Sequence, residues 1–158
     1  MAQKDELQVG VISDTHGLMR PEAIAALARV DHIIHAGDIG GPHVLAALQA
    51  IAPVTAVRGN NDIERWATAL PETSTVKLMN CSIYLIHNVR ELPIDPAEAG
   101  VSAVVAGHSH QAAMDVRNGV LFFNPGSAGP RRFRLPISLG RLTIRDGTVR
   151  GKLITLEL

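Results

Sequence analysis

The chain has 158 residues, of which 46% are hydrophobic and 3% aromatic, and its 15 Lys and Arg balance its 15 Asp and Glu. This length is typical of one domain with a sizeable core, so we expect a single domain over residues 1–158, and the composition excludes a disordered chain. The balanced charge excludes a global field that would attract nucleic acid or an anionic membrane. Any charged ligand must therefore bind at a local site.

The cysteine content and the lengths of the apolar runs indicate the cellular compartment that we expect for this protein. The single cysteine, Cys81, excludes an internal disulfide, and residues 1–6 contain no apolar signal region. No apolar run reaches the roughly 18 to 20 residues that span a bilayer. We therefore expect a cytoplasmic protein without a membrane segment.

Strand-like and helix-like patterns alternate in the first third of the chain. Strands are predicted over residues 7–13, 32–36 and 54–58, and helices over 21–28 and 42–51, each helix with proline in its first turn. This alternation predicts parallel strands joined by right-handed crossovers.

Strand pairs without intervening long helices follow. Residues 75–79 and 82–86 predict two strands joined by a tight turn at Asn80-Cys81. A short helix over 96–99 and an apolar strand over 101–106 are expected next.

The last third reads as two antiparallel hairpins. Asn118-Gly119 and Asp146-Gly147 each lie between apolar runs, and both dipeptides favour the positive φ angles of a type I′ turn. We therefore expect an α/β (α+β) fold, a four-layer αββα sandwich of two mixed β-sheets flanked by helices.

Five apolar runs end in residues that can bind metal ions. Ligands bind beyond the carboxyl ends of strands in open α/β sheets, so these segments are expected to converge. Each short motif is weak by itself, but five at strand ends indicate one cluster. The segments are Asp14-Thr15-His16, Gly37-Asp38, Gly59-Asn60-Asn61-Asp62, His87-Asn88 and Gly107-His108-Ser109-His110.

The cluster can be divided into two ligand shells. Asp38 can bridge two cations with its two carboxylate oxygens. Residues two apart on an extended segment point the same way, which places His108 beside His110 and Asp14 beside His16. The first predicted shell is Asp14, His16, Asp38 and one of the later histidines; the second is Asp38, Asn60, His87 and the other later histidine.

Carboxylate, amide and imidazole ligands without thiolates favour Mn²⁺, Fe or Zn²⁺. We expect two divalent ions, with Mn²⁺ favoured and Fe, Ni or Zn²⁺ as alternatives. Two ions about 3.5 to 4 Å apart hold a bridging water, lower its pKa and neutralise oxygens in a transition state. Phosphoryl hydrolysis is the predicted reaction.

These motifs, with Asn124-Pro125-Gly126-Ser127, stand in the order found in the calcineurin-like metallophosphoesterase superfamily. The chain most resembles its small single-domain phosphodiesterase branch of bacteria and archaea, from about Val9 to the terminal hairpin. The resemblance implies the αββα sandwich, a binuclear site, and in-line attack by a metal-bridging hydroxide on a small phosphodiester without a covalent enzyme intermediate. Asp38, Asn60 and Asp62 are the predicted catalytic residues, with Asp62 orienting its neighbours.

The chain departs from the superfamily pattern at two positions. Asn61 stands where many members have a histidine, and an amide cannot serve as a general acid, so we expect slower reaction with poor leaving groups. Asn88 stands where many relatives have glycine and would narrow the pocket or touch the substrate. Arg58 either contacts a substrate oxygen or forms a salt bridge beneath the site. Arg58, Asn61 and Asn88 are the predicted substrate contacts.

Several other reactive side chains are given structural roles. His32, His35 and His43 match no ligand position and are expected in packing or surface roles. Trp66 is expected to pack in the core. Cys81 has no visible base partner and is not a nucleophile.

Two segments after the fifth motif keep alternative roles. The loop Asn124–Ser127 is expected to be structural and to lie beside the site. The basic run Arg131, Arg132 and Arg134 either binds a phosphate or an acidic partner, or forms a solvated loop.

Two other functions are considered for this sequence, a protein-binding scaffold and a metal-dependent nuclease. A protein-binding scaffold could keep this fold, but such relatives have altered ligand positions and this chain retains the full set. A metal-dependent nuclease would need a stacking groove, which zero net charge and few aromatics do not provide, so we expect a small-molecule phosphoester as the partner and no nucleic acid. Exposed edge strands leave homo-oligomer formation open.

Overall fold

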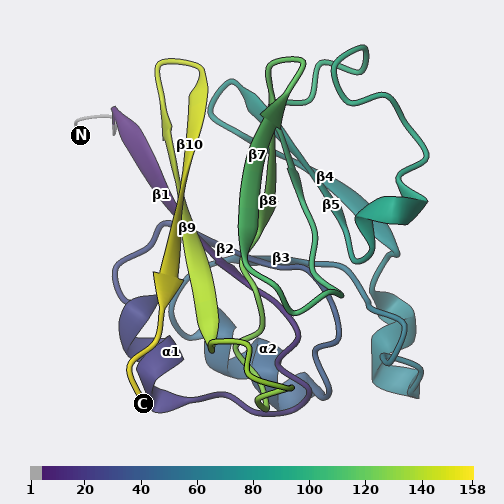
Figure 1. Ribbon diagram of the computed structural model, residues 1–158, viewed down its shortest axis with the longest axis vertical. Coiled ribbons are helices and arrows are strands. Elements are labelled where there is room, and N and C mark those ends of the chain that lie inside the picture. The colour runs from purple at the N-terminus through teal and green to yellow at the C-terminus, as the bar shows by residue number, and fades with distance from the viewer. Residues whose placement is uncertain (1–4) are drawn as a thin grey trace.

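The computed structural model describes residues 5–158, in which ten strands form two five-stranded sheets (Figure 1). The predicted lack of a signal region over residues 1–6 falls mostly on residues 1–4, which lie outside the described range. Within that range no helix is long and apolar enough to cross a membrane. In spatial order, the first sheet is β10 (Thr148–Thr155), β9 (Ser138–Arg145), β1 (Glu6–Ile12), β2 (His32–His35) and β3 (Val54–Ala56).

The first sheet confirms the predicted strand and helix alternation. Strands β1, β2 and β3 are parallel, and they are joined through α1 (Pro21–Ala26) and α2 (Pro42–Gln49), each beginning with proline. Both helices are shorter than predicted. The chain leaves α1 through Arg29, whose φ of 68° is incompatible with a continuing right-handed helix.

The second sheet combines parallel and antiparallel pairs. In spatial order it is β4 (Thr73–Leu78), β5 (Cys81–Ile86), β6 (Ala103–Val105), β8 (Val120–Asn124) and β7 (Ala113–Arg117). The β4–β5 turn was predicted one residue too late, because it consists of Met79 and Asn80, and Cys81 already pairs with Leu78. Met79 has a φ of 54°, an uncommon angle for methionine, and so the turn lacked a sequence signal.

The short helix predicted over 96–99 is wrong. Residues 96–100 form turns instead, in which the Ala99 amide bonds the Asp95 carbonyl at 3.0 Å. Gly100, with a φ of 74°, ends this turn before a second one can form. Hydrogen bonds spanning a single turn do not make a stable helix.

Both predicted type I′ hairpins are confirmed. Asn118 and Gly119 join β7 to β8 with φ angles of 50° and 79°, and Asp146 and Gly147 join β9 to β10 with 52° and 73°. These two positive angles match the right-handed twist of the flanking strands.

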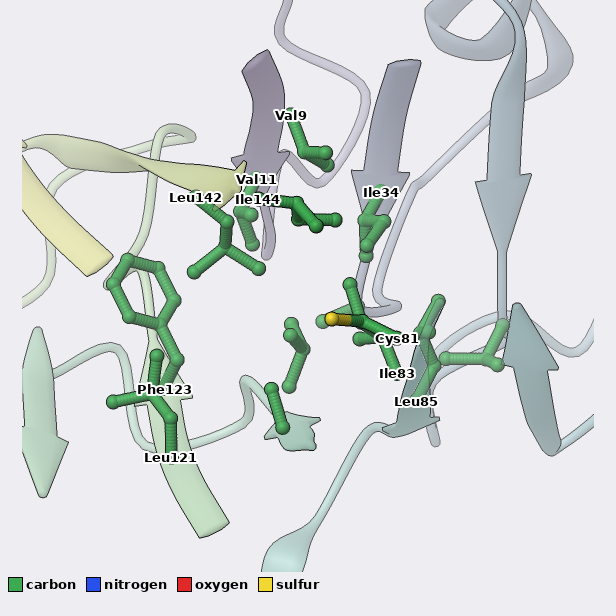
Figure 2. Packing of buried hydrophobic residues seen from close by; sticks show 14 residues of the cluster. Val9, Val11, Ile34, Cys81, Ile83, Leu85, Leu121, Phe123, Leu142 and Ile144 are labelled. Carbon is green, nitrogen blue, oxygen red and sulfur yellow. The ribbon is translucent and has the colours of Figure 1, made fainter. Parts of the chain in front are cut away.

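The main core lies between the two sheets (Figure 2). Alternate residues of each strand point into it, such as Val9 and Val11 from β1 and Ile83 and Leu85 from β5. Phe123 of β8 fits against two glycines of the first sheet: a Cβ on Gly140 would collide with its ring, and one on Gly151 would lie 2.8 Å from it.

The outer faces are covered differently. Leu27, directly after α1, and Leu48 of α2 are buried against the outside of the first sheet. The outside of the second sheet is covered by the segment after β5, which contains the 3₁₀ helix η2 (Val89–Glu91) and packs Leu92 and Ile94 onto the strands. The predicted sandwich of two mixed sheets is confirmed, with little helix in its fourth layer.

Candidate metal centre

The loops after β1, β2, β3, β5 and β6 meet at one edge of the sandwich, as predicted. The Asp14 amide bonds the Gly37 carbonyl at 3.0 Å, and the Gly107 amide bonds the His87 carbonyl at 2.9 Å. The loops of the first sheet are thus joined to each other, as are those of the second. Gly107 leaves no room for a side chain, since a Cβ would lie 2.7 Å from Asp14 Oδ2.

Five predicted ligands have left-handed backbone angles. The expectation that Asp14 and His16, and likewise His108 and His110, lie on extended segments is therefore wrong. The φ angles are 56° at Asp14, 46° at His16, 55° at Asp38, 72° at His108 and 62° at His110. Such angles cost of order 1 to 3 kcal/mol each in non-glycine residues and persist only where the surroundings impose them. Tight turns, rather than the alternation of side chains along a strand, therefore direct these side chains into the site.

Five of the predicted ligands form two overlapping groups. Asp14, His16 and His110 make the first group, and Asp14, Asp38 and His87 the second, with the ligand atoms of each group within 4.8 Å of one another. Asp14 Oδ1 lies 3.5 Å from His110 Nε2 and 4.0 Å from His16 Nε2. Asp14 belongs to both groups, and its Oδ1 also lies 3.9 Å from His87 Nε2. Asp38 belongs to the second group, and its Oδ2 lies 3.3 Å from His87 Nε2 and 3.8 Å from His16 Nε2 of the first.

Several buried polar atoms of this cluster lack a hydrogen-bond partner within residues 5–158. Four of its atoms are buried without any hydrogen bond: Asp14 Oδ1, His16 Nε2, His87 Nε2 and His110 Nδ1. A buried polar atom without a partner costs about 1 to 3 kcal/mol. Oxygen and imidazole donors grouped in this way fit divalent ions such as Mn²⁺, Fe²⁺ or Zn²⁺.

Hydrogen bonds around the cluster fix the imidazoles. His87 Nδ1 donates to the Ala36 carbonyl at 2.8 Å, which leaves Nε2 free to face the carboxylates. Beneath the site, the Gly37 amide donates to His35 Nδ1 at 3.1 Å, and His35 Nε2 is 3.0 Å from Thr15 Oγ1. Thr15 Oγ1 donates onward to the Ile39 carbonyl at 2.8 Å. His35 is thus a fully bonded neutral imidazole that ties two ligand loops together.

The electrostatics keep Asp38 ionised and lower the pKa of His16 and His110, whereas the pKa of His87 is raised because its contact with Asp38 outweighs burial. Burial raises the pKa of Asp38, but contact with His87 and the Asn61 amide outweighs it, so the pKa is lowered to about 2. Burial raises the pKa of Asp14 to about 6. Burial, with the charge of Arg132, lowers the pKa of His110 to about 4. Ionised carboxylate and neutral imidazole are the forms that bind metal ions.

Asn60 and His108 lie on the open side of the cluster. Both line a cleft of about 780 Å³ together with Arg58, His87 and Asn88. The exposed His108 ring meets His87 edge-on, with their centroids 5.2 Å apart. The structure thus places both residues on the side of Asp38 and His87, where the second shell was predicted.

The other residues of the predicted site hold loops. Asp62 accepts hydrogen bonds from the amides of Ile39, Gly40 and Gly59 at 2.9 to 3.1 Å, so it positions the loops after β2 and β3. The Asn61 backbone amide and Nδ2 donate to Asp38 at 2.9 and 3.2 Å.

Two of the predicted substrate contacts also bond to the protein. Arg58 Nη2 lies 3.4 Å from Glu72 Oε1, and the Asn88 side chain accepts the Arg90 amide at 3.1 Å at the start of η2. Both residues still line the cleft. The sequence left two roles open for Arg58, a substrate contact or a salt bridge. In the structure Arg58 forms a salt bridge and also lines the cleft.

The predictions for the remaining histidines and for Trp66 agree with their surroundings. His32 Nε2 is 2.8 Å from Thr55 Oγ1, and His43 Nε2 is 2.7 Å from the Gly17 carbonyl. Trp66 packs against the core beneath the helices.

Sequence reasoning missed the support given by Ser13. Ser13 Oγ donates to Asp14 Oδ2 at 2.8 Å, while Ser127 Oγ donates to the Asp14 carbonyl at 3.1 Å. Asn124 Nδ2 donates to the Gly107 carbonyl at 3.0 Å. The loop Asn124–Ser127 therefore holds two ligand loops, in keeping with its expected structural role. The role of Ser13 was not predicted, because a serine before an aspartate carries no sequence signal.

Residues 7–147 match the model of the calcineurin-like phosphoesterase superfamily domain. The chain belongs to this superfamily. It is 33% identical to a probable metallophosphoesterase of Methanocaldococcus jannaschii, over 94% of this chain and 81% of the relative. It is 25% identical to a phosphodiesterase of the same organism, over 76% of this chain and 83% of the relative.

Among solved structures, Vps29 of Chaetomium thermophilum has the same fold. The TM-score is 0.76 at 19% identity, and the match covers 96% of this chain and 100% of Vps29. This likeness concerns the fold alone. The superfamily resemblance seen in the motifs is thus confirmed over most of the chain.

Proposed function

We propose that this protein is a binuclear metal-dependent phosphodiesterase that hydrolyses small phosphodiesters. The observation that supports it best is the cluster of Asp14, His16, Asp38, His87 and His110, whose ligand atoms form two groups within 4.8 Å and which contains four buried atoms without a hydrogen bond in residues 5–158. A phosphodiesterase among the curated relatives supports the diester as substrate class.

Each ligand residue of the cluster has a proposed role in holding one of two metal ions. Asp14, His16 and His110 would hold one ion, Asn60, His87 and His108 the other, and Asp38 would lie between them. Such a pair of ions supplies an activated water at neutral pH and offsets the charge on the phosphoryl oxygens. Mn²⁺ is the proposed native metal, with Fe, Ni and Zn²⁺ as alternatives that this ligand set also accepts.

The side chains near the site oppose a covalent mechanism. Ser13 Oγ donates its proton to Asp14 and Thr15 Oγ1 donates to the Ile39 carbonyl, so neither hydroxyl is free. Cys81 is buried in the core. We therefore retain in-line hydrolysis by water. Asn61 cannot protonate a leaving group, which favours diesters whose leaving group departs as a stable anion.

The test is hydrolysis of bis-p-nitrophenyl phosphate with added Mn²⁺. Asp38→Asn should lower kcat/KM by at least about 100-fold, because Asp38 belongs to one ligand group and its Oδ2 also lies 3.8 Å from His16 of the other. Asp115→Asn is the matched control, since Asp115 is exposed on β7 and paired only with Arg117. Activity retained by Asp38→Asn, or absent from the native chain with every metal, would end the proposal.

A second candidate is a protein-binding scaffold, which the fold shared with Vps29 favours. Such a scaffold would need no metal cluster. Partner capture by the Asp38→Asn variant, with no phosphoester turned over by the native chain, would favour it over hydrolysis.

A further inference from the structure

The loop between β8 and β9 lies directly against the loop that carries Asp14 and His16. Its base is closed by a bridge between Ser127 and Ile137, and the Ala128 amide donates to the Ser13 carbonyl at 3.1 Å. A Cβ on Gly129 would lie 2.6 Å from the Thr15 carbonyl oxygen. In Figure 1 this yellow-green loop lies beside the purple loop that follows β1. We call residues 130–136 the arginine loop.

Arg132 lies in this loop three residues after Gly129, which packs against the backbone carbonyls of Asp14 and Thr15. Burial is the largest cause of the lowered pKa values of His16 and His110, and the charge of Arg132 lowers both further. These histidines stand on different loops, so the charge of Arg132 acts on both ligand loops. Arg132 is exposed, and within residues 5–158 its side chain has no hydrogen-bond or ion-pair partner. Its donors are therefore free for a ligand.

Phe133 follows Arg132 and is 92% exposed. The other aromatic residues, Trp66, Tyr84, Phe122 and Phe123, are all at least partly buried in the described part of the chain. Phe133 also has a φ of 54°, which a bulky side chain rarely adopts. A strained and exposed aromatic next to an unpaired arginine indicates a binding role.

The cleft is lined by other ligands of the cluster than those that the arginine loop affects. The cleft is lined by Asn60, His87 and His108, whereas Arg132 acts on His16 and His110. A phosphodiester has two organic substituents on one phosphorus. A phosphate at the cluster can therefore extend one substituent into the cleft and the other toward the arginine loop.

We propose that two residues of the arginine loop bind substrate: Arg132 binds a non-bridging phosphoryl oxygen and Phe133 stacks on a planar aromatic substituent. This inference rests on the proposed phosphodiesterase function and narrows its substrate class. The preferred substrates are diesters that carry at least one flat ring of the nucleobase or aryl type. Monoesters lose one of the two substituent contacts.

The test is calorimetric binding of two non-hydrolysable monoanions, diphenylphosphinate and dimethylphosphinate, to the Mn²⁺-loaded protein. Phe133→Ala should weaken diphenylphosphinate binding about 5- to 150-fold, the range for loss of one stacked ring, and leave dimethylphosphinate unchanged. Phe133→Trp should retain the affinity. Arg132→Ala should weaken both ligands by at least about 10-fold, because it removes a charged donor.

Arg134→Ala is the matched control in the same loop and should bind both ligands as the native chain does. Equal diphenylphosphinate affinity in the native chain and Phe133→Ala would overturn the stacking role. Equal affinity in Arg132→Ala and Arg134→Ala would overturn the phosphate contact. Hydrolysis of bis-p-nitrophenyl phosphate by the native chain separates these failures from failure of the proposed function, which would abolish turnover itself.

Discussion

Asp38 is the residue on which most contacts of the site converge. Its two oxygens accept the Asn61 amide and side chain at 2.9 and 3.2 Å, and its Oδ2 lies 3.3 Å from His87 Nε2. These contacts hold its pKa at about 2 in spite of burial. The carboxylate is therefore ionised and oriented before any cation arrives, which lowers the ordering cost of binding.

Asp62 illustrates a residue that acts through its neighbours. Asp62→Asn replaces an acceptor by an amide donor that faces the Ile39, Gly40 and Gly59 N–H groups, so at least one of these loses its partner. We expect a loss of about 1 to 3 kcal/mol in the free energy of unfolding. Mn²⁺ affinity should fall about 10- to 100-fold, as for other supporting groups of metal sites. Urea unfolding and competition titration measure the two effects, and unchanged Mn²⁺ affinity would contradict the positioning role.

His35 gives a pH dependence of known sign. Burial lowers its pKa from 6.5 to about 3, so between these values the unfolded chain binds a proton that the folded chain does not. Stability from this group is present above pH 6.5 and is lost as the pH falls, at up to about 1.4 kcal/mol per pH unit. His35→Gln should be less stable at neutral pH but show a shallower loss between about pH 6.5 and about pH 4.5. Urea unfolding of the metal-free proteins tests this, and parallel pH curves would contradict it.

The strand ends require glycine where two ligand loops approach each other. Gly59, after β3, is pressed against Asp38: a Cβ there would collide with the Asp38 amide and would lie 2.8 Å from its carboxylate carbon. Neither backbone nor ligand can move away without opening the cluster.

Gly59→Ala should therefore lower Mn²⁺ affinity by at least about 10-fold while the far-UV circular dichroism stays native, because the sheets do not depend on this contact. Gly41→Ala is the control, since the nearest atoms to its Cβ belong to the exposed side chain of His43, whose displacement would cost the bond to the Gly17 carbonyl but would not press on a ligand. Equal Mn²⁺ affinity in both variants would show that the close approach is not needed.

Most elements could be predicted from local patterns. Apolar runs revealed β5 and β8, and the dipeptides at Asn118 and Asp146 revealed the final hairpins, because apolar runs and turn chemistry are local properties. The Met79 turn and the outer layer on the second sheet could not be predicted, since tertiary packing decides them.

The site divides in the same way. The types and order of its ligands were readable, because each motif ends its own strand. The sequence did not reveal the left-handed turns at Asp14 and His110 or the hydrogen bond between Thr15 and His35. These features depend on partners about 20 or more residues away along the chain.

At the scale of the whole molecule, the metal cluster joins the two sheets. Asp14, His16 and Asp38 follow strands of the first sheet, whereas His87 and His110 follow strands of the second. Cations held by both sets would link the two halves of the sandwich, and separation of the sheets on unfolding would break the site.

Metal removal should therefore lower thermal stability. At a free Mn²⁺ concentration about 100 times Kd, binding to the folded state alone adds about 2.7 kcal/mol. For a chain of this size that is a rise in Tm of roughly 5 to 10 °C, which a chelator should reverse. Differential scanning calorimetry measures the change, and the double variant Asp38→Asn, His87→Ala should show none. A Tm unaffected by Mn²⁺ in the native chain would contradict the link between the sheets.

Anomalous diffraction from crystals grown with Mn²⁺ tests the convergence of these ligands most directly. Two peaks are predicted for each chain, one among Asp14, His16 and His110 and the other beside Asp38 and His87, with Asp38 contacting both. The absence of anomalous signal at this edge of the sandwich, at Mn²⁺ concentrations that saturate any binding in solution, would contradict the account.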